Sequence, residues 1–232
     1  MNRQIHFSWK TKKIPKKFQT WVNSWKLYNP SWETKLWTDE DNRNFLKEHY
    51  QEFLEIYDGY SSNIERADSM RYFYLYHFGG LYVDLDFECL RNIESLLNSE
   101  ILLGQVSARR YKRNPIQEVH PSFMYSDKKR HNFFGEIVNG GLKTAFFKYR
   151  DIDRTKRGFG CIEAWTTGIE FLRQKVIAGK KNYDINVVRE EIYPYHHRER
   201  SEFICIKDFG KRFPNSFAVH HWENSYNNQT KE

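Results

Sequence analysis

Cysteine is scarce in this chain of 232 residues, which contains only Cys89, Cys161 and Cys205. The three are odd in number, far apart and never in a C-x-x-C pair, which argues against a disulfide framework and against a thiolate metal site. Long apolar runs are missing too: the N-terminal MNRQIHFSWK lacks the apolar stretch of a signal peptide, and no segment has the ~18 consecutive apolar residues of a membrane span. We expect a reducing compartment and no transmembrane segment in this chain.

Aromatic side chains and positive charge are abundant. Phe, Tyr and Trp make up 17% of the residues, the formal net charge is +7 and the pI is about 9.1. Such a charge favours anionic partners, including nucleotides, phosphorylated substrates, nucleic acid and anionic membranes, without choosing among them. The aromatic residues offer flat faces for stacking.

Strands and helices are expected to alternate along the first hundred residues, as in an α/β protein with a mainly parallel sheet. The expected strands are Ile5–Trp9, 32–38 and Leu81–Leu85, and the expected helices are Phe18–Tyr28, a segment from Asp39 onward and Ser61–Phe78. Later in the chain we expect helices at Phe133–Phe147 and Thr167–Ala178 and short strands at Ile192–Pro194 and Phe217–His220. No repeat or domain boundary is visible.

The helix at Ser61–Phe78 has the clearest boundaries. Ser62 and Glu65 have the spacing of a capping box, and Gly79-Gly80 provide a stop where positive φ is tolerated. Asp68 and Arg71 are three residues apart and share one face of this helix. Because the helix must run antiparallel to the strand that it precedes, its start is expected near the carboxyl end of that strand. A plain intrahelical ion pair is the alternative interpretation.

Asp84 and Asp86 follow the apolar strand in the sequence GGLYVDLDFE. In open α/β sheets, ligands bind outside the carboxyl ends of the strands, so these carboxylates are expected at the rim of a crevice. Hard oxygen ligands suit Mg²⁺ or Mn²⁺, which complete their coordination with waters and substrate phosphates. Taken alone, D-x-D is also typical of a turn or of a helix N-cap.

Four blocks together resemble the DXD sugar-binding glycosyltransferases, which include yeast mannosyltransferases, capsule-synthesis enzymes and clostridial toxins. The blocks are Ile5–Trp9, Ala67–Tyr72, Gly79–Asp86 and Ala218–Trp222, in the family's order. The resemblance implies a GT-A fold with a Rossmann-like sheet and a smaller acceptor-binding region. It implies one domain over 1–232: a nucleotide-sugar-binding half, an acceptor-binding half with the metal-site strand, and a polar tail, at 1–103, 104–222 and 223–232.

The resemblance also assigns roles on the donor side. Trp9 would stack on the nucleotide base, with Phe7 lining that pocket. Asp68 and Arg71 would bind the ribose or the donor sugar. The implied activity is transfer of a hexosyl or deoxyhexosyl group from a nucleotide sugar, with a UDP-sugar favoured and GDP-mannose as the alternative. Transfer to a hydroxyl of a glycan or glycoprotein is expected to retain the anomeric configuration.

The same resemblance implies a Mn²⁺ or Mg²⁺ site. Asp86 would bind the ion directly, His220 would complete or border the site, and Asp84 would contact the ribose or reach the ion through water. Because neighbouring residues on a strand face opposite sides, His220 rather than His221 is the expected ligand. Asp84, Asp86 and Arg71 are the expected catalytic residues.

The acceptor side is assigned to Thr167, Gly168, Trp222 and Tyr226. Here the sequence departs from the family, with Ile169 in place of a common proline and Tyr226 in place of a common tryptophan. Residues 120–134 resemble the segment through which the acceptor enters, and a plain loop followed by a helix is the alternative.

Two further basic segments can be explained as exposed surface. His196-His197 is expected in an exposed loop. Arg109, Arg110, Lys112 and Arg113 are either solvated or grip an anionic acceptor or the diphosphate.

Three other functions compete with the transferase. They are a catalytically inactive relative, a D-x-D phosphohydrolase and a basic nucleic-acid-binding module, which would not need three aspartates around one crevice. We expect no nucleic-acid partner. A cytoplasmic location in a bacterium or a virus-infected cell is favoured, with the Golgi lumen as the alternative if the sequence is an excised catalytic domain.

Overall fold

The computed structural model describes residues 2–106, 119–152, 162–203 and 208–223. The central sheet consists of β1 (Gln4–Ser8), β2 (Glu33–Trp37), β3 (Gly80–Val83), β5 (Ile101–Gln105), β6 (Val119–Ser126) and β7 (Ile185–Val188). Its order is β2-β1-β3-β6-β5-β7. β1 is parallel to β2 and β3, β7 is parallel to β5, and β6 is antiparallel to both of its neighbours. The predicted mainly parallel α/β sheet is therefore confirmed.

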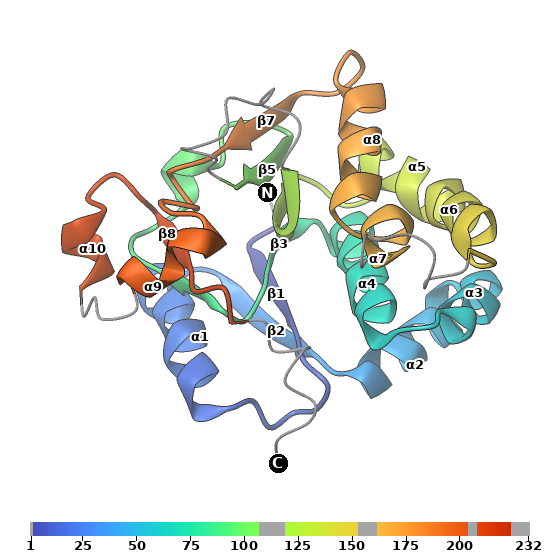
Figure 1. Ribbon diagram of the computed structural model, residues 1–232, viewed down its shortest axis with the longest axis horizontal. Helices are drawn as coiled ribbons and strands as arrows, with labels where there is room; N and C mark the ends of the chain where they lie inside the picture. Colours follow the sequence, from blue (N-terminus) through green and yellow to red (C-terminus); the bar gives the residue numbers. More distant parts are fainter. Residues whose placement is uncertain (1, 107–118, 153–161, 204–207, 224–232) are drawn as a thin grey trace.

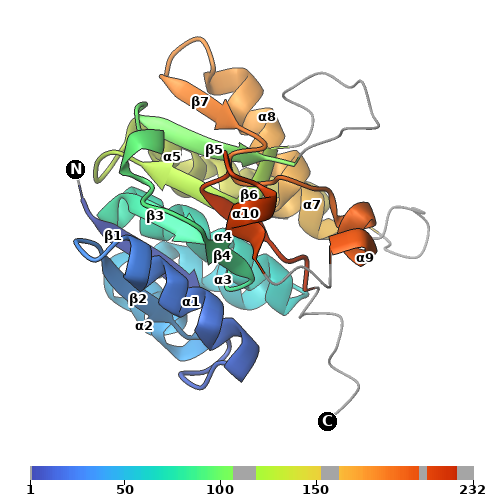
Figure 2. The ribbon, with the colours of Figure 1, turned by 90° about the vertical axis from the view of Figure 1, so that its left-hand side faces the viewer.

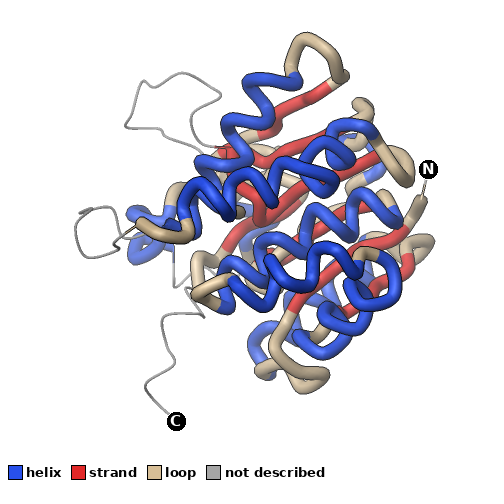
Figure 3. Tube along the Cα trace, turned by 90° about the vertical axis from the view of Figure 1, so that its right-hand side faces the viewer, coloured by secondary structure: helices blue, strands red, loops and turns tan. Residues whose placement is uncertain are grey.

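One face of the sheet is covered by a layer of helices (Figures 1 and 3). They are α2 (Asp39–His49), α3 (Leu54–Gly59), α4 (Asn63–Phe78), α5 (Asn132–Glu136), α6 (Leu142–Tyr149), α7 (Ile162–Thr166) and α8 (Ile169–Gly179), with a π-helical turn at Ile137–Gly141. Among the described residues, no helix is both long and apolar enough to cross a membrane.

The other face carries α1 (Lys16–Tyr28), α9 (Arg200–Phe203), α10 (Phe209–Arg212) and a small sheet of β4 (Phe87–Cys89) and β8 (Ala218–His220) (Figure 2). The strands are buried from both sides: Tyr82 packs into the helical layer, whereas Leu81 and Val83 pack toward α1 and β4. Burial on both faces explains why β3 is apolar without alternation.

Helix α4 forms as predicted. Ser62 Oγ accepts the N–H of Glu65, and the Glu65 carboxylate accepts the N–H of Ser62, both at 3.2 Å. The helix ends at Phe78, and Gly79 and Gly80 adopt φ angles of 69° and 84°. Nearly every side chain between Glu65 and Leu75 is buried. Caps and burial together fix this helix against β3.

Three predicted elements differ in the structure. β3 ends at Val83 rather than Leu85, because the chain turns at Asp84, whose C=O accepts the Phe87 N–H at 3.1 Å. Ile192–Pro194 is not a strand: Ile192 and Tyr193 are apolar because they are buried in a turned segment, and the strand lies earlier, at β7. Within 120–134, the start of the predicted loop is strand β6.

Gly80, the first residue of β3, has little room for a side chain. A Cβ at this position would lie 2.4 Å from the Gln4 carbonyl oxygen, in a conformation with positive φ. We expect Gly80→Ala to lower the free energy of unfolding by about 2–4 kcal/mol, measured by urea titration. Gly140→Ala is the matched control, because its Cβ would meet no atom within 4 Å. Equal stability of both variants would contradict the prediction.

Candidate active site

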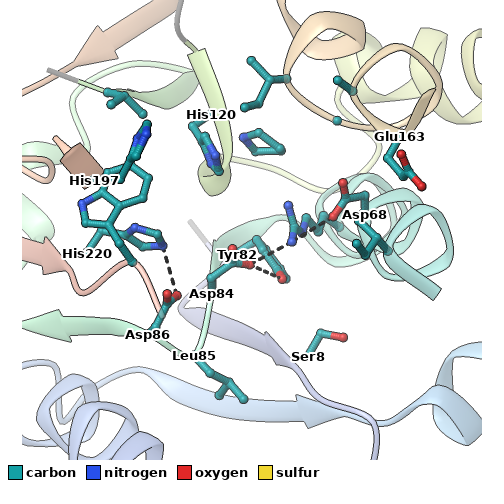
Figure 4. Close-up of a pocket in the computed structure, with 18 of the residues that line it drawn as sticks. Ser8, Asp68, Tyr82, Asp84, Leu85, Asp86, His120, Glu163, His197 and His220 are labelled. Atoms are coloured by element: carbon teal, nitrogen blue, oxygen red, sulfur yellow. Dashed lines mark hydrogen bonds and ion pairs between the residues drawn. The ribbon is translucent and has the colours of Figure 1, made fainter. Parts of the chain in front are cut away.

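A cavity of about 680 Å³ opens where β1 and β3 end (Figure 4). Because β6 is antiparallel to β3, its first residues lie at the same edge. The lining includes Ser8, Trp9, Asp68, Arg71, Tyr82, Asp84, Asp86, His120, Glu163, Gly168, His196, His197, Arg198, His220 and Trp222. The cavity thus combines residues from the beginning, middle and end of the chain.

Arg71 connects helix α4 to the end of β3. Its Nη2 lies 2.9 Å from Oδ1 of Asp68 and 3.1 Å from Oδ1 of Asp84. Tyr82 OH donates to the same Asp84 oxygen at 2.7 Å, and the guanidinium carbon lies 5.1 Å from the Tyr82 ring centroid. The expected proximity of the helix start to the carboxyl end of the strand is confirmed. The Asp68–Arg71 ion pair is present and also belongs to the cavity.

Asp84, Asp86 and His220 form a cluster whose ligand atoms all lie within 4.8 Å of one another. β4 and β8 bring them together, because Phe87 pairs with His220 across the small sheet. Nε2 of His220 lies 3.0 Å from Oδ1 of Asp86. As expected from strand alternation, His221 faces the other way, with its Nε2 3.0 Å from Glu88 and its ring stacked on Trp21.

The three aspartates titrate differently because their surroundings differ. Burial raises the pKa of Asp68 to about 6, although Arg71 acts in the opposite direction. Burial also raises the pKa of Asp84, again against Arg71 and with the repulsion of Asp86. For Asp86, burial is outweighed by His220 and by the N–H of Glu223, which donates to Oδ2 at 2.9 Å, and its pKa falls below the usual range. Asp86 is therefore the carboxylate held most firmly in its charged form.

The cluster fits a divalent cation. His220 is 6% exposed, and neither ring nitrogen makes an aligned hydrogen bond with a described residue, although Nε2 is at ion-pair distance from Asp86. A buried imidazole without such bonds, beside two carboxylates that are 23% and 16% exposed, is a suitable ligand set for Mn²⁺ or Mg²⁺.

The two aromatic residues expected on the donor side, Trp9 and Phe7, line different cavities. Trp9 follows β1, is half-buried, lines the cavity and packs edge-on against Phe18 with ring centroids 5.3 Å apart. Phe7 is 1% exposed and does not line this cavity. Instead, it lines a smaller cavity of about 240 Å³ beneath α1.

Only two of the four predicted acceptor residues are found lining the cavity among the described residues. Gly168 and Trp222 line the cavity, and the buried Nε1 of Trp222 has no hydrogen-bond partner among the described residues. Thr167 is buried, does not line the cavity, and accepts the Tyr72 hydroxyl on its carbonyl at 2.7 Å. Tyr226 lies outside the described residues, as do the basic residues of 109–113.

Several cavity residues were not predicted. His120, which begins the segment expected either to admit the acceptor or to form a plain loop, lies in strand β6, and Glu163 lies on a short helix near Asp68 (Figure 4). His196 and His197 line the cavity at a short 3₁₀ helix, although His197 is exposed as expected. No spacing in the sequence marks these residues, because only the sheet order and the late chain segments bring them to the cavity.

The comparisons with known proteins agree with this geometry. Residues 15–103 match the family described as glycosyltransferase sugar-binding region containing DXD motif. Inositol phosphoceramide mannosyltransferases 3 and 2 of Schizosaccharomyces pombe are 48% and 45% identical over 97 and 93 residues, which is 40% of this chain. The chain spans only 26% and 27% of the length of these relatives.

Among solved structures, the PaToxG glycosyltransferase is similar with a TM-score of 0.50 and 16% identity, covering 78% of this chain and 70% of that chain. At this identity the likeness concerns the fold, and it confirms the predicted GT-A fold. The expected resemblance to the DXD glycosyltransferases is likewise confirmed by the family match, which includes Asp68, Arg71, Asp84 and Asp86.

The raised pKa of Asp68 predicts that the difference in unfolding free energy between the wild type and Asp68→Asn depends on pH. The folded state binds the Asp68 proton more tightly than the unfolded state, so its contribution to stability is complete below about pH 4 and is lost as the pH rises through 6. Relative to Asp68→Asn, the wild type should lose up to about 3 kcal/mol of unfolding free energy between pH 4 and pH 7. Urea titrations at several pH values measure this difference.

Asp58 provides the control for this experiment. Its exposed carboxylate is hydrogen-bonded to Arg43, which lowers its pKa. The difference between wild type and Asp58→Asn should therefore be small and have the opposite sign. A pH-independent difference for Asp68→Asn would contradict the burial argument.

Proposed function

We propose that this chain, whose residues 15–103 carry the sugar-binding region of the DXD glycosyltransferases, transfers a hexosyl group from a nucleotide sugar to a hydroxyl of a glycan or glycoprotein. The observation that carries the proposal is the cluster of Asp84, Asp86 and His220 in the same cavity as Asp68 and Arg71. Such a cavity offers a cation site for a diphosphate next to hydrogen-bonding groups for a sugar.

The donor would occupy the length of this cavity. Trp9 would stack on the base, and Asp68 and Arg71 would bind hydroxyls of the ribose or sugar, because all three line the cavity. Phe7 would not contact the donor; it would stabilise β1, the strand that Trp9 follows. A UDP-sugar remains a candidate donor, while the names of the two yeast relatives favour a mannosyl group and thus GDP-mannose.

Asp86 and His220 would hold Mn²⁺ or Mg²⁺, with Asp84 in contact directly or through water. The cation would neutralise the leaving diphosphate. Arg71 keeps Asp84 oriented at the end of β3, and the backbone N–H of Glu223 does the same for Asp86. These contacts pre-position the carboxylates, so that little reorganisation is needed when the substrate binds.

The acceptor would enter near Gly168 and Trp222, with Thr167 and Tyr226 as further candidates. Position 168 has little room for a side chain, because a Cβ there would approach Asp68 Oδ2 to 3.4 Å and the Glu163 carbonyl oxygen to 3.0 Å. The relatives are named for inositol phosphoceramide, which makes a phosphoinositol-containing glycolipid one acceptor to test.

A screen of UDP- and GDP-sugars for hydrolysis and transfer, with and without Mn²⁺, tests this function. We expect activity on one donor, loss of activity with EDTA, and a decrease of about 100-fold or more in Asp86→Asn, because the cation loses its charged ligand. Mn²⁺ affinity, measured by calorimetry, should fall in the same variant.

Glu88→Gln is the matched control for Asp86→Asn. Glu88 also lies 3.0 Å from a histidine, His221, but neither residue lines the cavity. Its activity should remain near that of the wild type. Nucleotide-sugar binding without turnover would instead identify an inactive relative, and wild-type activity in Asp86→Asn would refute the metal assignment.

Retention of configuration is the second expectation about the reaction. We propose attack on the donor-sugar face that the diphosphate leaves, with a leaving phosphate oxygen accepting the proton of the incoming hydroxyl. NMR of the first-formed product should show the anomeric configuration of the donor. An inverted product would rule out this mechanism while leaving the transferase activity intact.

A further inference from the structure

His120 is a histidine of the cavity that was not named as a site residue, although the segment 120–134 that it begins resembles the one through which the acceptor enters. It lies at the start of β6 and, in Figure 4, across the cavity from Asp86. Its ring centroid is 6.2 Å from that of His220 and 6.1 Å from that of Trp222. His120 therefore borders the part of the cavity where the cation and the diphosphate would bind.

One ring nitrogen of His120 is occupied. Nδ1 accepts the N–H of Ser122 at 3.3 Å and lies 2.7 Å from Ser122 Oγ, which is paired with the hydroxyl of Tyr193. Because a backbone N–H can only donate, these contacts assign the lone pair to Nδ1 and the proton of the neutral ring to Nε2.

The other nitrogen of His120 is available to a ligand. Because Nδ1 accepts a backbone N–H, it carries no proton, so the ring is neutral with its single proton on Nε2. Nε2 makes no hydrogen bond with any residue in the described ranges, and the side chain lines the cavity. A fixed neutral N–H donor thus borders the site.

His6 shows what a purely structural histidine looks like in this fold. It is buried, with a pKa lowered to about 4 mainly by burial. However, both of its nitrogens are used: Nδ1 accepts the Trp37 indole N–H at 3.2 Å, and Nε2 lies 3.0 Å from the Gly79 carbonyl oxygen. His120 satisfies only Nδ1, so packing alone does not account for it.

We propose that His120 is a catalytic residue that donates its Nε2–H to an oxygen of the donor diphosphate, and that Ser122 and Tyr193 position its ring. The inference rests on the proposed transferase function. The bond between the anomeric carbon and the phosphate oxygen breaks, the bond to the acceptor oxygen forms, and the acceptor proton passes to the leaving phosphate. His120 keeps its own proton throughout and stabilises the negative charge that develops on the diphosphate.

A pair of amide substitutions separates this role from a packing role. In His120→Gln the side-chain amide reaches close to the position of Nε2, whereas in His120→Asn it ends near Nδ1. We expect His120→Asn to lower kcat by about 10- to 100-fold and His120→Gln to retain more activity. If the ring only filled space beside Ser122, Asn would be tolerated at least as well as Gln.

Ligand binding provides a readout independent of turnover. With Mg²⁺ present, calorimetry with UDP and GDP should show several-fold weaker binding to His120→Asn, while binding of uridine and guanosine should not change. His49→Gln, on the distant helix α2, is the control and should match the wild type in both assays. Equal diphosphate affinity for wild type and His120→Asn would overturn the proposal.

The wild type provides a test that does not depend on the folding of any variant. The ¹⁵N–¹H signal of His120 Nε2 should move downfield on addition of the nucleoside diphosphate with Mg²⁺, and not on addition of the nucleoside. An unmoved signal would refute the contact. A wild type without activity on any nucleotide sugar would refute the proposed function, whereas an active wild type with unaffected His120 variants would refute only this inference.

Discussion

Arg71 joins two carboxylates from different elements of the fold, Asp68 within its own helix and Asp84 at the end of β3. Charges removed from water are costly unless each one is paired and hydrogen-bonded, so helix and strand must keep this spacing. Tyr82 adds a further hydrogen bond to Asp84. The ion pairs of Arg71 therefore fix the position at which Asp84 and Asp86 emerge from the core, and both aspartates line the cavity there.

The second constraint is the small sheet of β4 and β8, which joins residues more than a hundred positions apart. It places the neighbouring residues His220 and His221 on opposite sides, because adjacent residues of an extended chain point in opposite directions. His220 lies beside Asp86 at the cavity, whereas His221 lies beside Glu88 and stacks on Trp21 of α1. Two neighbouring histidines consequently have different surroundings, and only the first has the ligand geometry of a cation site.

The electrostatics of the cavity follow from the same arrangement. Asp84 and Asp86 are two residues apart and burial acts to raise the pKa of both, yet the pKa values shift in opposite directions because His220 and the Glu223 N–H together outweigh burial at Asp86. Asp86 is thus held in its ionised form, whereas the ionised form of Asp84 depends on the ion pair with Arg71. Near them, His120 lines the cavity with Nδ1 occupied by the Ser122 N–H, which leaves Nε2–H for the proposed contact with a diphosphate.

The sequence by itself determined the local features of this protein: the capping box of α4, the glycine stop after it, the apolar strand, and the acidic pair that follows. These depend on neighbours within a few residues, so periodicity and spacing reveal them. Only the tertiary structure decided that Phe7 faces away from the cavity, that residues 192–194 are buried without forming a strand, and that His120 reaches the site. Each depends on strand order and on contacts between distant segments, which leave no spacing pattern in the sequence.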